Sequence, residues 1–282
     1  MDASTSKDFL VLNPDEMDQS PVRGMDLAAS LGISWLEMRT AWGSNLLMLS
    51  DRRIEEIRSM AESRGLRIAA LASPLWKWCR PEATARRVDS FGFPTRVPLE
   101  DRADWIERAL SVAHLLGTKR VRVFSHLRVE PHLTDSFEDD PLLPWALERA
   151  HAAGVRLLLE NEPVCTVAEP GPLLSVLHRH PGLGLWLDLG NLHEVGTADE
   201  PTVAALAPFT EYIHIKDFHQ SPGQCRAFCP AGTGDVPYSQ LLPVLRRVRP
   251  GLPYALETHV KDDPAAALKQ GAEYLRRALP GL

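Results

Sequence analysis

Four acidic or imidazole side chains stand near the ends of short apolar segments in the second half of the chain. They are Glu160 in VRLLLENEP, Asp188 in GLWLDLGN, His214 in YIHIKDF and Glu257 in YALETHV. Alternate residues of a β-strand point to opposite faces. If the purely apolar set of each segment faces covering helices, the four polar side chains face a shared interior. Three carboxylates and one imidazole are a ligand set for a divalent cation.

The predicted cluster needs a positive charge. Carboxylates that share a buried site repel one another and are costly to desolvate unless a cation joins them. An oxygen-rich set suits Mn²⁺, Mg²⁺ or Co²⁺ and accepts Zn²⁺, and four protein ligands leave an octahedral ion two positions for substrate oxygens. We therefore expect one divalent metal ion in an open, catalytic site. Glu162 shares the parity of Glu160, but Pro163 follows it at once, which favours Glu160 as the ligand.

Eight apolar segments would supply the strands that position this cluster. Amphipathic stretches with helical spacing separate them, such as DRRIEEIRSMAESRG, in which a glycine follows the last turn. This alternation is typical of a parallel sheet, and no G-x-G-x-x-G follows the first segment to indicate a dinucleotide-binding open sheet. The sequence predicts an α/β fold, a single (β/α)8 TIM barrel over residues 1–282, with residues 1–6 disordered. The predicted strands are 9–13, 33–39, 67–73, 120–125, 155–160, 184–189, 212–217 and 254–257.

Composition and charge limit the class of partner. The 282 residues are 44% hydrophobic and carry a formal net charge of −6, which allows a large core and disfavours a broad nucleic-acid surface. The N-terminus lacks the pattern of a secretory signal, and no apolar run reaches the roughly 18 residues of a membrane helix. Four cysteines are too few for a disulfide scaffold and are interpreted as free thiols, with a metal role for Cys225 and Cys229 as the weaker alternative. We expect a cytoplasmic protein that acts on a small molecule and binds neither nucleic acid nor membrane; a homo-oligomer stays open.

Two long connections follow predicted strands, at 74–99 and 218–237. In a TIM barrel the loops after the strands build the active-site face, and loops of this length are usually functional or mobile. Trp76, in the first connection, could form an apolar wall that stacks on a sugar, or it could pack the irregular loop itself. His219 and His259 lie close in the chain to predicted ligands, and a second metal ion bound by them is the weaker alternative to a single ion.

Three more polar residues are candidates for substrate contact. Glu37 and Arg39 share the inward parity of their segment, so Glu37 either contacts substrate or forms an internal salt bridge with Arg39. His126 shares the inward parity of the fourth predicted strand and lies just beyond its end. Lys216 follows the predicted imidazole ligand by two residues. It either binds a substrate hydroxyl or neutralises the carboxylates as a structural ion pair.

The segments that carry the predicted ligands also carry a family resemblance. LLLENEP, LWLDLGN, YIHIKDF and YALET resemble the metal-binding strands five to eight of the sugar phosphate isomerase/epimerase family of xylose-isomerase-like TIM barrels. GTGDVPYSQLL, from Gly232, is similar to the G-x-G-[DE]-v-x-[WYF] segment that this family has between strands seven and eight. The resemblance implies that Glu160 and Glu257 bind the metal ion and also act as the acid/base pair, while Asp188 and His214 complete the coordination.

The chain departs from the epimerase pattern at two positions. Asn191, three residues past Asp188, stands where epimerase relatives place a substrate-contacting histidine, so the resemblance implies a polar substrate contact there. Gln220, six residues past His214, stands where ketose-epimerase relatives carry an arginine. This second difference argues against a simple ketose 3-epimerase.

The predicted function is a divalent-metal-dependent isomerase or epimerase of a sugar, keto-sugar or polyol derivative. A metal ion that chelates a carbonyl and a neighbouring hydroxyl oxygen acidifies the adjacent C–H, and carboxylates then move the proton through an enediolate. If a leaving group lies β to the acidified carbon, the same residues give elimination. The alternative is therefore a metal-dependent lyase or dehydratase of a keto-sugar or keto-glycoside.

Two further functions stay open on weaker grounds. A phosphodiesterase like the apurinic endonucleases of this barrel type would need several more histidine and aspartate ligands and a surface that accepts DNA. The shortage of inward histidines before the seventh predicted strand argues against the ligands, and the acidic balance of the chain argues against the surface. A barrel that only binds or scaffolds would not require all four ligand types, which the sequence retains.

Overall fold

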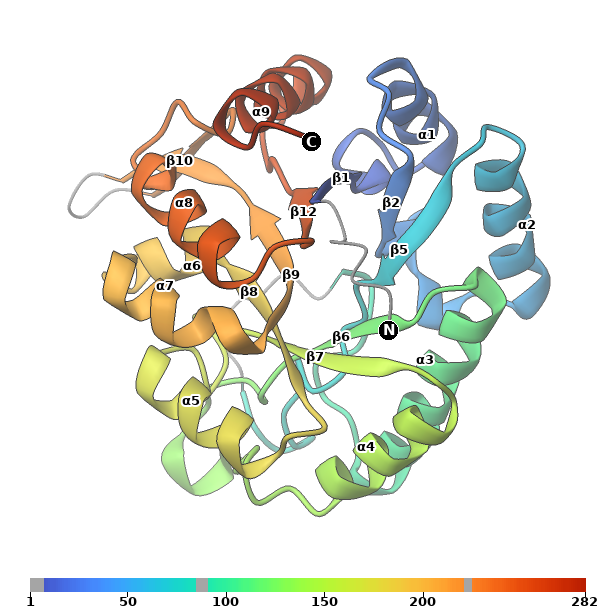
Figure 1. Cartoon of the computed structure of the whole chain (residues 1–282). Helices are drawn as coiled ribbons and strands as arrows, with labels where there is room; N and C mark the ends of the chain where they lie inside the picture. Colours follow the sequence, from blue (N-terminus) through green and yellow to red (C-terminus); the bar gives the residue numbers. More distant parts are fainter. Residues whose placement is uncertain (1–7, 85–90, 221–224) are drawn as a thin grey trace, which may run out of the picture.

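The computed structural model describes residues 8–84, 91–220 and 225–282. Eight parallel strands close into a barrel in the spatial order β1-β12-β9-β8-β7-β6-β5-β2, and the helices form a ring outside it (Figure 1). The predicted (β/α)8 barrel is therefore confirmed, while the disorder expected for residues 1–6 lies outside the described residues. The barrel strands are Phe9–Leu12 (β1), Trp35–Met38 (β2), Arg67–Leu71 (β5), Arg120–Val123 (β6), Arg156–Glu160 (β7), Gly184–Asp188 (β8), Thr210–Ile215 (β9) and Pro253–Leu256 (β12).

Each predicted segment overlaps one barrel strand, but most strands end earlier than predicted, and β9 and β12 also begin earlier. The second segment, predicted over 33–39, forms a strand only over Trp35–Met38, and the fourth, predicted over 120–125, ends at Val123. The residues just beyond these ends leave the sheet and begin the loops on the carboxyl face. Side chains that were expected on the last residues of these strands therefore lie in the loops at the mouth of the barrel.

Each helix covers the barrel with one apolar face. In α2 (Asp51–Glu62) the buried residues Ile54, Ile57 and Ala61 are three or four positions apart, as on one side of a helix. α3 (Arg102–Leu116) ends at Gly117, whose φ of 73° favours a residue without a Cβ. The other α-helices are α1 (Pro21–Ser30), α4 (Leu142–Ala152), α5 (Pro170–Arg179), α6 (Leu189–Glu194), α7 (Glu200–Leu206), α8 (Tyr238–Val248) and α9 (Pro264–Ala278). Short 3-10 helices are η1 (Pro14–Glu16), η2 (Leu46–Met48), η3 (Leu99–Asp101), η4 (Pro131–Leu133) and η5 (Ala207–Phe209).

The two long connections differ in structure. In the described part of the first, the chain is irregular and is held by an isolated bridge between Cys79 and Arg96. The second contains an antiparallel hairpin of β10 (Asp217–His219) and β11 (Ala227–Cys229). A smaller hairpin, β3 (Thr40–Ala41) with β4 (Ser44–Asn45), follows β2.

The core has an inner and an outer layer, as the alternation of side chains predicts. The inner layer fills the barrel, and its largest members are Trp186 and Tyr212, whose ring centroids lie 3.8 Å apart. Their chain neighbours Leu185, Leu187 and Ile213 belong to the larger core shared with the helices. The ring centroids of Trp186 and His214 lie 5.0 Å apart. The inner layer therefore borders the polar side chains at the carboxyl ends of the strands. The inner layer consists of Val11, Ala69, Ala70, Ala72, Leu158, Trp186, Tyr212 and Ala255.

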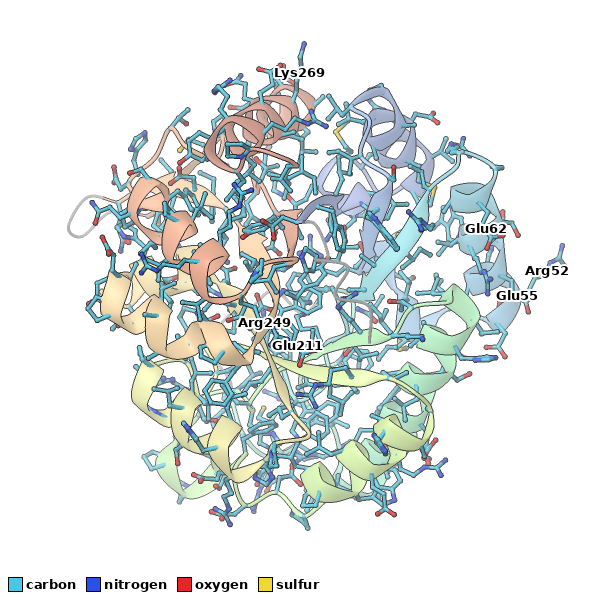
Figure 2. The ribbon with its side chains drawn as sticks, viewed as in Figure 1. Arg52, Glu55, Glu62, Glu211, Arg249 and Lys269 are labelled. Atoms are coloured by element: carbon cyan, nitrogen blue, oxygen red, sulfur yellow. The ribbon has the colours of Figure 1, made fainter. Side chains whose placement is uncertain are left out.

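Charged side chains cover the outside of the helices. Arg52, Glu55 and Lys269 are exposed and point away from the barrel (Figure 2). Among the helices of the described ranges, none combines the length and the apolar character of a membrane span.

All four cysteines are free thiols, as interpreted from the sequence. Burial raises the pKa of the Cys165 thiol to about 12, so this side chain is unreactive. In the described part of the chain no cysteine belongs to a group of metal-competent side chains, which removes the support for a metal role of Cys225 and Cys229.

Candidate metal centre

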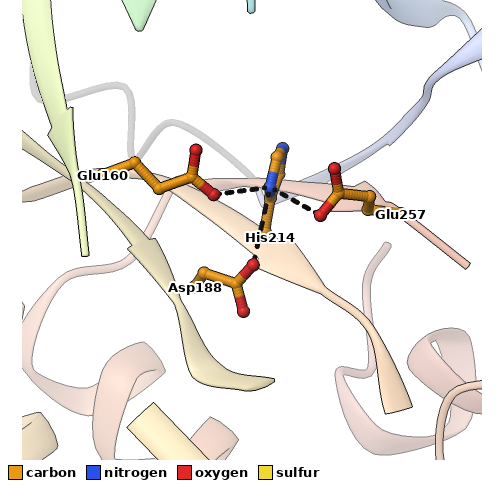
Figure 3. A group of neighbouring side chains, drawn as sticks. All are labelled: Glu160, Asp188, His214 and Glu257. Atoms are coloured by element: carbon orange, nitrogen blue, oxygen red, sulfur yellow. Dashed lines mark ion pairs between the residues drawn. The ribbon is translucent and has the colours of Figure 1, made fainter. Parts of the chain in front are cut away.

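The carboxyl ends of four neighbouring strands bring the predicted ligands together. Glu160 ends β7, Asp188 ends β8, His214 lies on β9, and Glu257 directly follows β12. All four are at most 3% exposed, and one ligand atom from each lies within 4.8 Å of the others. Figure 3 shows the three carboxylates arranged around the imidazole. The predicted cluster is thus present as a geometric arrangement that a metal ion could occupy.

The imidazole of His214 places Nδ1 at the centre of the cluster. Nδ1 lies 3.3 Å from Glu160 Oε1, 3.3 Å from Glu257 Oε2 and 3.7 Å from Asp188 Oδ2 (Figure 3). It makes no hydrogen bond to any described residue. A buried nitrogen that faces three carboxylate oxygens without a partner fits a cation between them.

The other ring nitrogen fixes the tautomer of His214. Nε2 lies 2.9 Å from Glu37 Oε2, and Asn13 Nδ2 donates to Glu37 Oε1 at 3.2 Å. Because a carboxylate only accepts, Nε2 carries a proton and donates it, so Nδ1 is the ring nitrogen that faces the cluster and could bind a metal ion. Carboxylate-histidine-metal arrangements of this kind orient the ring and raise its basicity. The structure therefore places Glu37 behind the imidazole, and Glu37 does not line the cavity that lies over the cluster.

Arg39 holds the carboxylate of Glu257. Its Nη1 donates to Glu257 Oε1 at 2.6 Å, which leaves Oε2 for the cluster, and its Nη2 donates to Glu16 Oε1 at 2.7 Å. Asp15 accepts two further hydrogen bonds from the same guanidinium. Burial disfavours the charge on Arg39, but the surrounding carboxylates raise its pKa well above the ordinary value. The salt bridge between Glu37 and Arg39, one of the two alternatives for Glu37, is not formed, because Glu37 pairs with His214 and Arg39 with Asp15, Glu16 and Glu257.

Two other cations flank the remaining carboxylates. Arg122 Nη1 lies 3.0 Å from Glu160 Oε2, and Lys216 Nζ lies 2.8 Å from Asp188 Oδ2. Burial works against a charge on Lys216, but Asp188 and Glu257 raise the pKa of its amine, so that it stays protonated. Asp188 is fixed in addition by the backbone N–H of Asn191, which donates to Oδ1 at 2.9 Å. Both readings of Lys216, substrate contact and ion pair, are compatible with this position.

A second group that could hold a metal consists of Glu16, Glu257 and His259. The guanidinium of Arg39 already binds both carboxylates, at 2.7 and 2.6 Å. A second dication would have to displace this buried positive charge. His219 is exposed and pairs with Asp235 at 3.0 Å. The geometry therefore favours a single ion.

A cavity of about 280 Å³ opens over the four-residue cluster. Asn191 and Lys216, two of the predicted substrate contacts, belong to its wall. Two of its residues, Arg226 and Phe228, lie on or beside the β10–β11 hairpin, so the second long connection contributes to the site. The wall consists of Lys77, Phe91, Arg122, Glu160, Glu162, Val164, Asn191, Lys216, Arg226, Phe228, Glu257 and His259.

His126 and Trp76 are placed elsewhere. His126 Nε2 and Trp76 Nε1 each lie 2.9 Å from Asp140 Oδ2, and both side chains are buried. Neither belongs to the cavity wall. Because the chain turns at His126, where φ is 60°, its side chain leaves the inward direction predicted from the fourth strand. The arrangement of both side chains supports the loop-packing alternative for Trp76.

Sequence reasoning missed Lys77 and Arg226 in the cavity wall. The only signal for Lys77 was its position between two tryptophans in LWKWC. It also missed Asp217, which is fully buried and accepts hydrogen bonds from the N–H groups of Gly232 and Gly234, both at 2.9 Å. The glycine-rich segment after β11 therefore wraps around a carboxylate next to Lys216.

Comparison with known proteins gives the family. A family model described as xylose isomerase-like TIM barrel matches residues 25–278. The chain belongs to the xylose isomerase-like TIM barrel family. No curated protein matches the chain significantly.

Solved structures share the fold of this family member at low sequence identity. An IolI protein with a bound zinc atom has a TM-score of 0.74 and 15% identity, over 96% of this chain and 98% of that chain. The probable 3-DHS dehydratase AsbF of Bacillus anthracis has a TM-score of 0.71 and 16% identity, over 95% and 98%. A D-allulose 3-epimerase from Methylomonas sp., in complex with D-allulose, has a TM-score of 0.71 and 14% identity, over 97% and 98%. At these identities the likeness establishes the fold and leaves the reaction open.

Proposed function

We propose that this protein is a divalent-metal-dependent isomerase or epimerase of a sugar, keto-sugar or polyol derivative. The observation that carries the proposal is the unpartnered Nδ1 of His214, which faces one oxygen from each of three buried carboxylates. The zinc atom of the IolI protein and the substrate of the D-allulose epimerase support a metal and a sugar for this fold. The metal ligands in the proposal are Glu160, Asp188, His214 and Glu257.

In the proposed reaction, each residue of the site has a separate role. A divalent ion, when bound, polarises a carbonyl oxygen and favours loss of a proton from the neighbouring carbon. Glu160 and Glu257 lie on opposite sides of His214 (Figure 3), which suits one carboxylate to take that proton while the other, as the acid, returns one. If the proton is returned to the adjacent carbon, the reaction is an isomerisation. If it is returned to the opposite face of the same carbon, the reaction is an epimerisation. Lys216 stays protonated and donates a hydrogen bond to the substrate oxygen that gains negative charge.

Hydrogen exchange in D₂O tests the proposal. We expect the Mn²⁺-loaded protein, incubated with a panel of ketoses, to introduce deuterium next to the carbonyl, as measured by NMR. Glu160→Gln and Glu257→Gln should each lower the exchange rate at least about 100-fold, the usual contribution of a general acid or base. Glu55→Gln, on the exposed face of α2, is the matched control. Absence of exchange across the panel, with Mn²⁺ bound, would contradict the proposal.

A second candidate is elimination of water by the same residues. Asn191 in the cavity wall and the exposed Gln220 depart from the epimerase pattern, and the second departure argues against a simple ketose 3-epimerase. The probable dehydratase AsbF has the same fold. Product analysis separates the two reactions, because a dehydratase product is 18 Da lighter by mass spectrometry and an isomer or epimer keeps the substrate mass.

A further inference from the structure

We propose that the substrate carries an anionic group, a phosphate or a carboxylate, and that Lys77 binds it. This inference rests on the proposed function, because it concerns the same cavity. It adds a chemical class that the metal cluster does not specify.

Three of the four cations in the cavity wall have a close carboxylate partner. Arg122 lies 3.0 Å from Glu160, Lys216 lies 2.8 Å from Asp188, and Arg226 pairs with Glu194. The fourth cation is therefore the one that an anionic group of the substrate would meet without displacing a close ion pair. The four cations are Lys77, Arg122, Lys216 and Arg226.

Lys77 is the cation of this wall with the weakest partner. Its side chain is 4% exposed, and Glu162 is the one described carboxylate within 4 Å, with Oε1 at 3.6 Å from Nζ. This distance is longer than a hydrogen bond, and no described residue accepts one from Nζ. The rings of Phe91 and Phe124 lie at 4.6 and 4.8 Å from Nζ. A buried ammonium with open donor positions suits an anionic oxygen.

The backbone holds Lys77 firmly in this position. Trp76 has a φ of 61°, an unfavourable value for a bulky residue, and its indole donates to Asp140 at 2.9 Å. The backbone N–H of His126 donates to Trp76 O at 2.7 Å, and that of Leu127 donates to Trp78 O at 3.0 Å. The neighbouring tryptophans are thus buried in the core while Lys77 lines the cavity. Strained backbone that is fixed on both sides is typical of a residue placed for binding.

The alternative is that Lys77 only neutralises Glu162. Both residues line the cavity, and Glu162 keeps 19% of its side chain exposed. A structural pair would leave the binding of neutral and anionic ligands equally dependent on Lys77. An anion site would make only the binding of anions depend on it.

Three probes with the same α-hydroxyketone end separate these readings: fructose, fructose 6-phosphate and fructuronate. Each is titrated by calorimetry into the Mn²⁺-loaded full chain and into the variants Lys77→Met, Lys77→Arg and Lys269→Met. Lys269 is exposed on α9 and points outward (Figure 2), which makes it the matched control. Titration of Mn²⁺ alone into each variant checks the metal cluster separately.

We expect at least one anionic probe to bind about tenfold more tightly than fructose, the effect of one charge-assisted hydrogen bond. Lys77→Met should remove this preference and leave the affinity for fructose and Mn²⁺ within about twofold, and Lys77→Arg should restore most of it. Preference for fructose 6-phosphate indicates a phosphate, and preference for fructuronate a carboxylate. Anionic probes that bind no more tightly than fructose, or equal losses for all three probes in Lys77→Met, overturn the inference. Failure of Mn²⁺ to bind the unmodified protein would instead overturn the proposed function.

Discussion

Glu37 acts on the cluster through the imidazole of His214. Its Oε2 accepts the Nε2 proton, and its Oε1 accepts a hydrogen bond from Asn13. All three side chains are fully buried, so the hydrogen-bonded chain Asn13–Glu37–His214 is shielded from bulk solvent. The orientation of the His214 imidazole therefore depends on a residue that does not belong to the cavity wall.

Replacement of Glu37 should weaken metal binding and leave the fold in place. Glu37→Gln keeps an acceptor for Nε2 but removes the negative charge, and loss of such a supporting partner lowers metal affinity about 10- to 100-fold. Calorimetric titration with Mn²⁺ measures the change. The control Glu55→Gln, on the exposed face of α2, should keep the affinity of the unmodified protein. Unchanged affinity in Glu37→Gln would mean that the charge of Glu37 does not act on His214.

Arg39 should contribute to stability as well as to the metal site. Arg39→Met leaves Asp15, Glu16 and Glu257 without their buried cation, and breaking such a pair costs about 3–5 kcal/mol. We expect the free energy of unfolding in urea to fall by about this amount, and Mn²⁺ affinity to fall with it. Arg23 pairs with Asp18 on the surface, where their side chains are 68% and 30% exposed. Arg23→Met should therefore cost less than about 1 kcal/mol. Equal costs for the two substitutions would contradict the structural role of Arg39.

At the scale of elements, the segment after β11 closes over the carboxylate of Asp217. This carboxylate accepts four backbone hydrogen bonds, from Phe218, Gly232, Gly234 and Val236. The segment brings Tyr238, at the start of α8, to donate from its hydroxyl to the carbonyl oxygen of Lys216 at 2.5 Å. The glycine-rich pattern thus supports the strand end that carries Lys216.

Gly234 has no room for a side chain. A Cβ at this position would lie 2.2 Å from Asp217 Oδ1 and 2.7 Å from the backbone nitrogen of Phe218. We expect Gly234→Ala to lower the free energy of unfolding by about 2 kcal/mol or more, because the segment must move away from the carboxylate. Gly171, on α5, has no atom within 4 Å of its added Cβ. Gly171→Ala should be neutral or stabilising by up to about 1 kcal/mol. Similar stability of the two variants in urea would contradict this reading of the segment.

At the scale of the molecule, the four candidate ligands lie at the ends of strands on one side of the barrel. β7, β8, β9 and β12 are neighbours in the closed sheet, so a bound ion links four consecutive strand ends. An ion that binds only the folded state adds about 2.7 kcal/mol at one hundred times its dissociation constant. We expect Mn²⁺ to raise the Tm by several degrees, and EDTA to reverse the rise. The variant Glu160→Gln should show a smaller rise, and no rise in the unmodified protein would favour a metal-free scaffold.

The same linkage predicts how metal binding depends on pH. In the metal-free protein, burial works against a charge on His214, but Glu37 and Glu257 raise its pKa well above the ordinary value. A metal ion must then displace the proton from Nδ1. Below the raised pKa, affinity should rise with pH by up to about tenfold per unit for each proton released. Calorimetry in buffers of different ionisation enthalpy counts the protons. An affinity that is constant between about pH 6 and 8 would contradict this competition.

The sequence by itself determined the barrel and the positions of four candidate ligands. Alternation along a strand is a local property, so Glu160, Asp188, His214 and Glu257 could be assigned to one face from their own segments. The order of strands and helices can likewise be predicted from the spacing of apolar residues within each segment. Their metal binding stays a prediction that the geometry supports.

Only the tertiary structure decided which side chains face one another across the closed barrel. Glu37 meets His214 across 177 positions of the chain, and Arg39 meets Glu257 across 218. Parity says that each of these residues points inward, but not which partner it finds. His126 departs from the direction expected for its strand because the backbone turns there, and Lys77 lines the cavity from an irregular loop. Such positions depend on contacts between distant segments, and the pattern of a single segment carries no information about them.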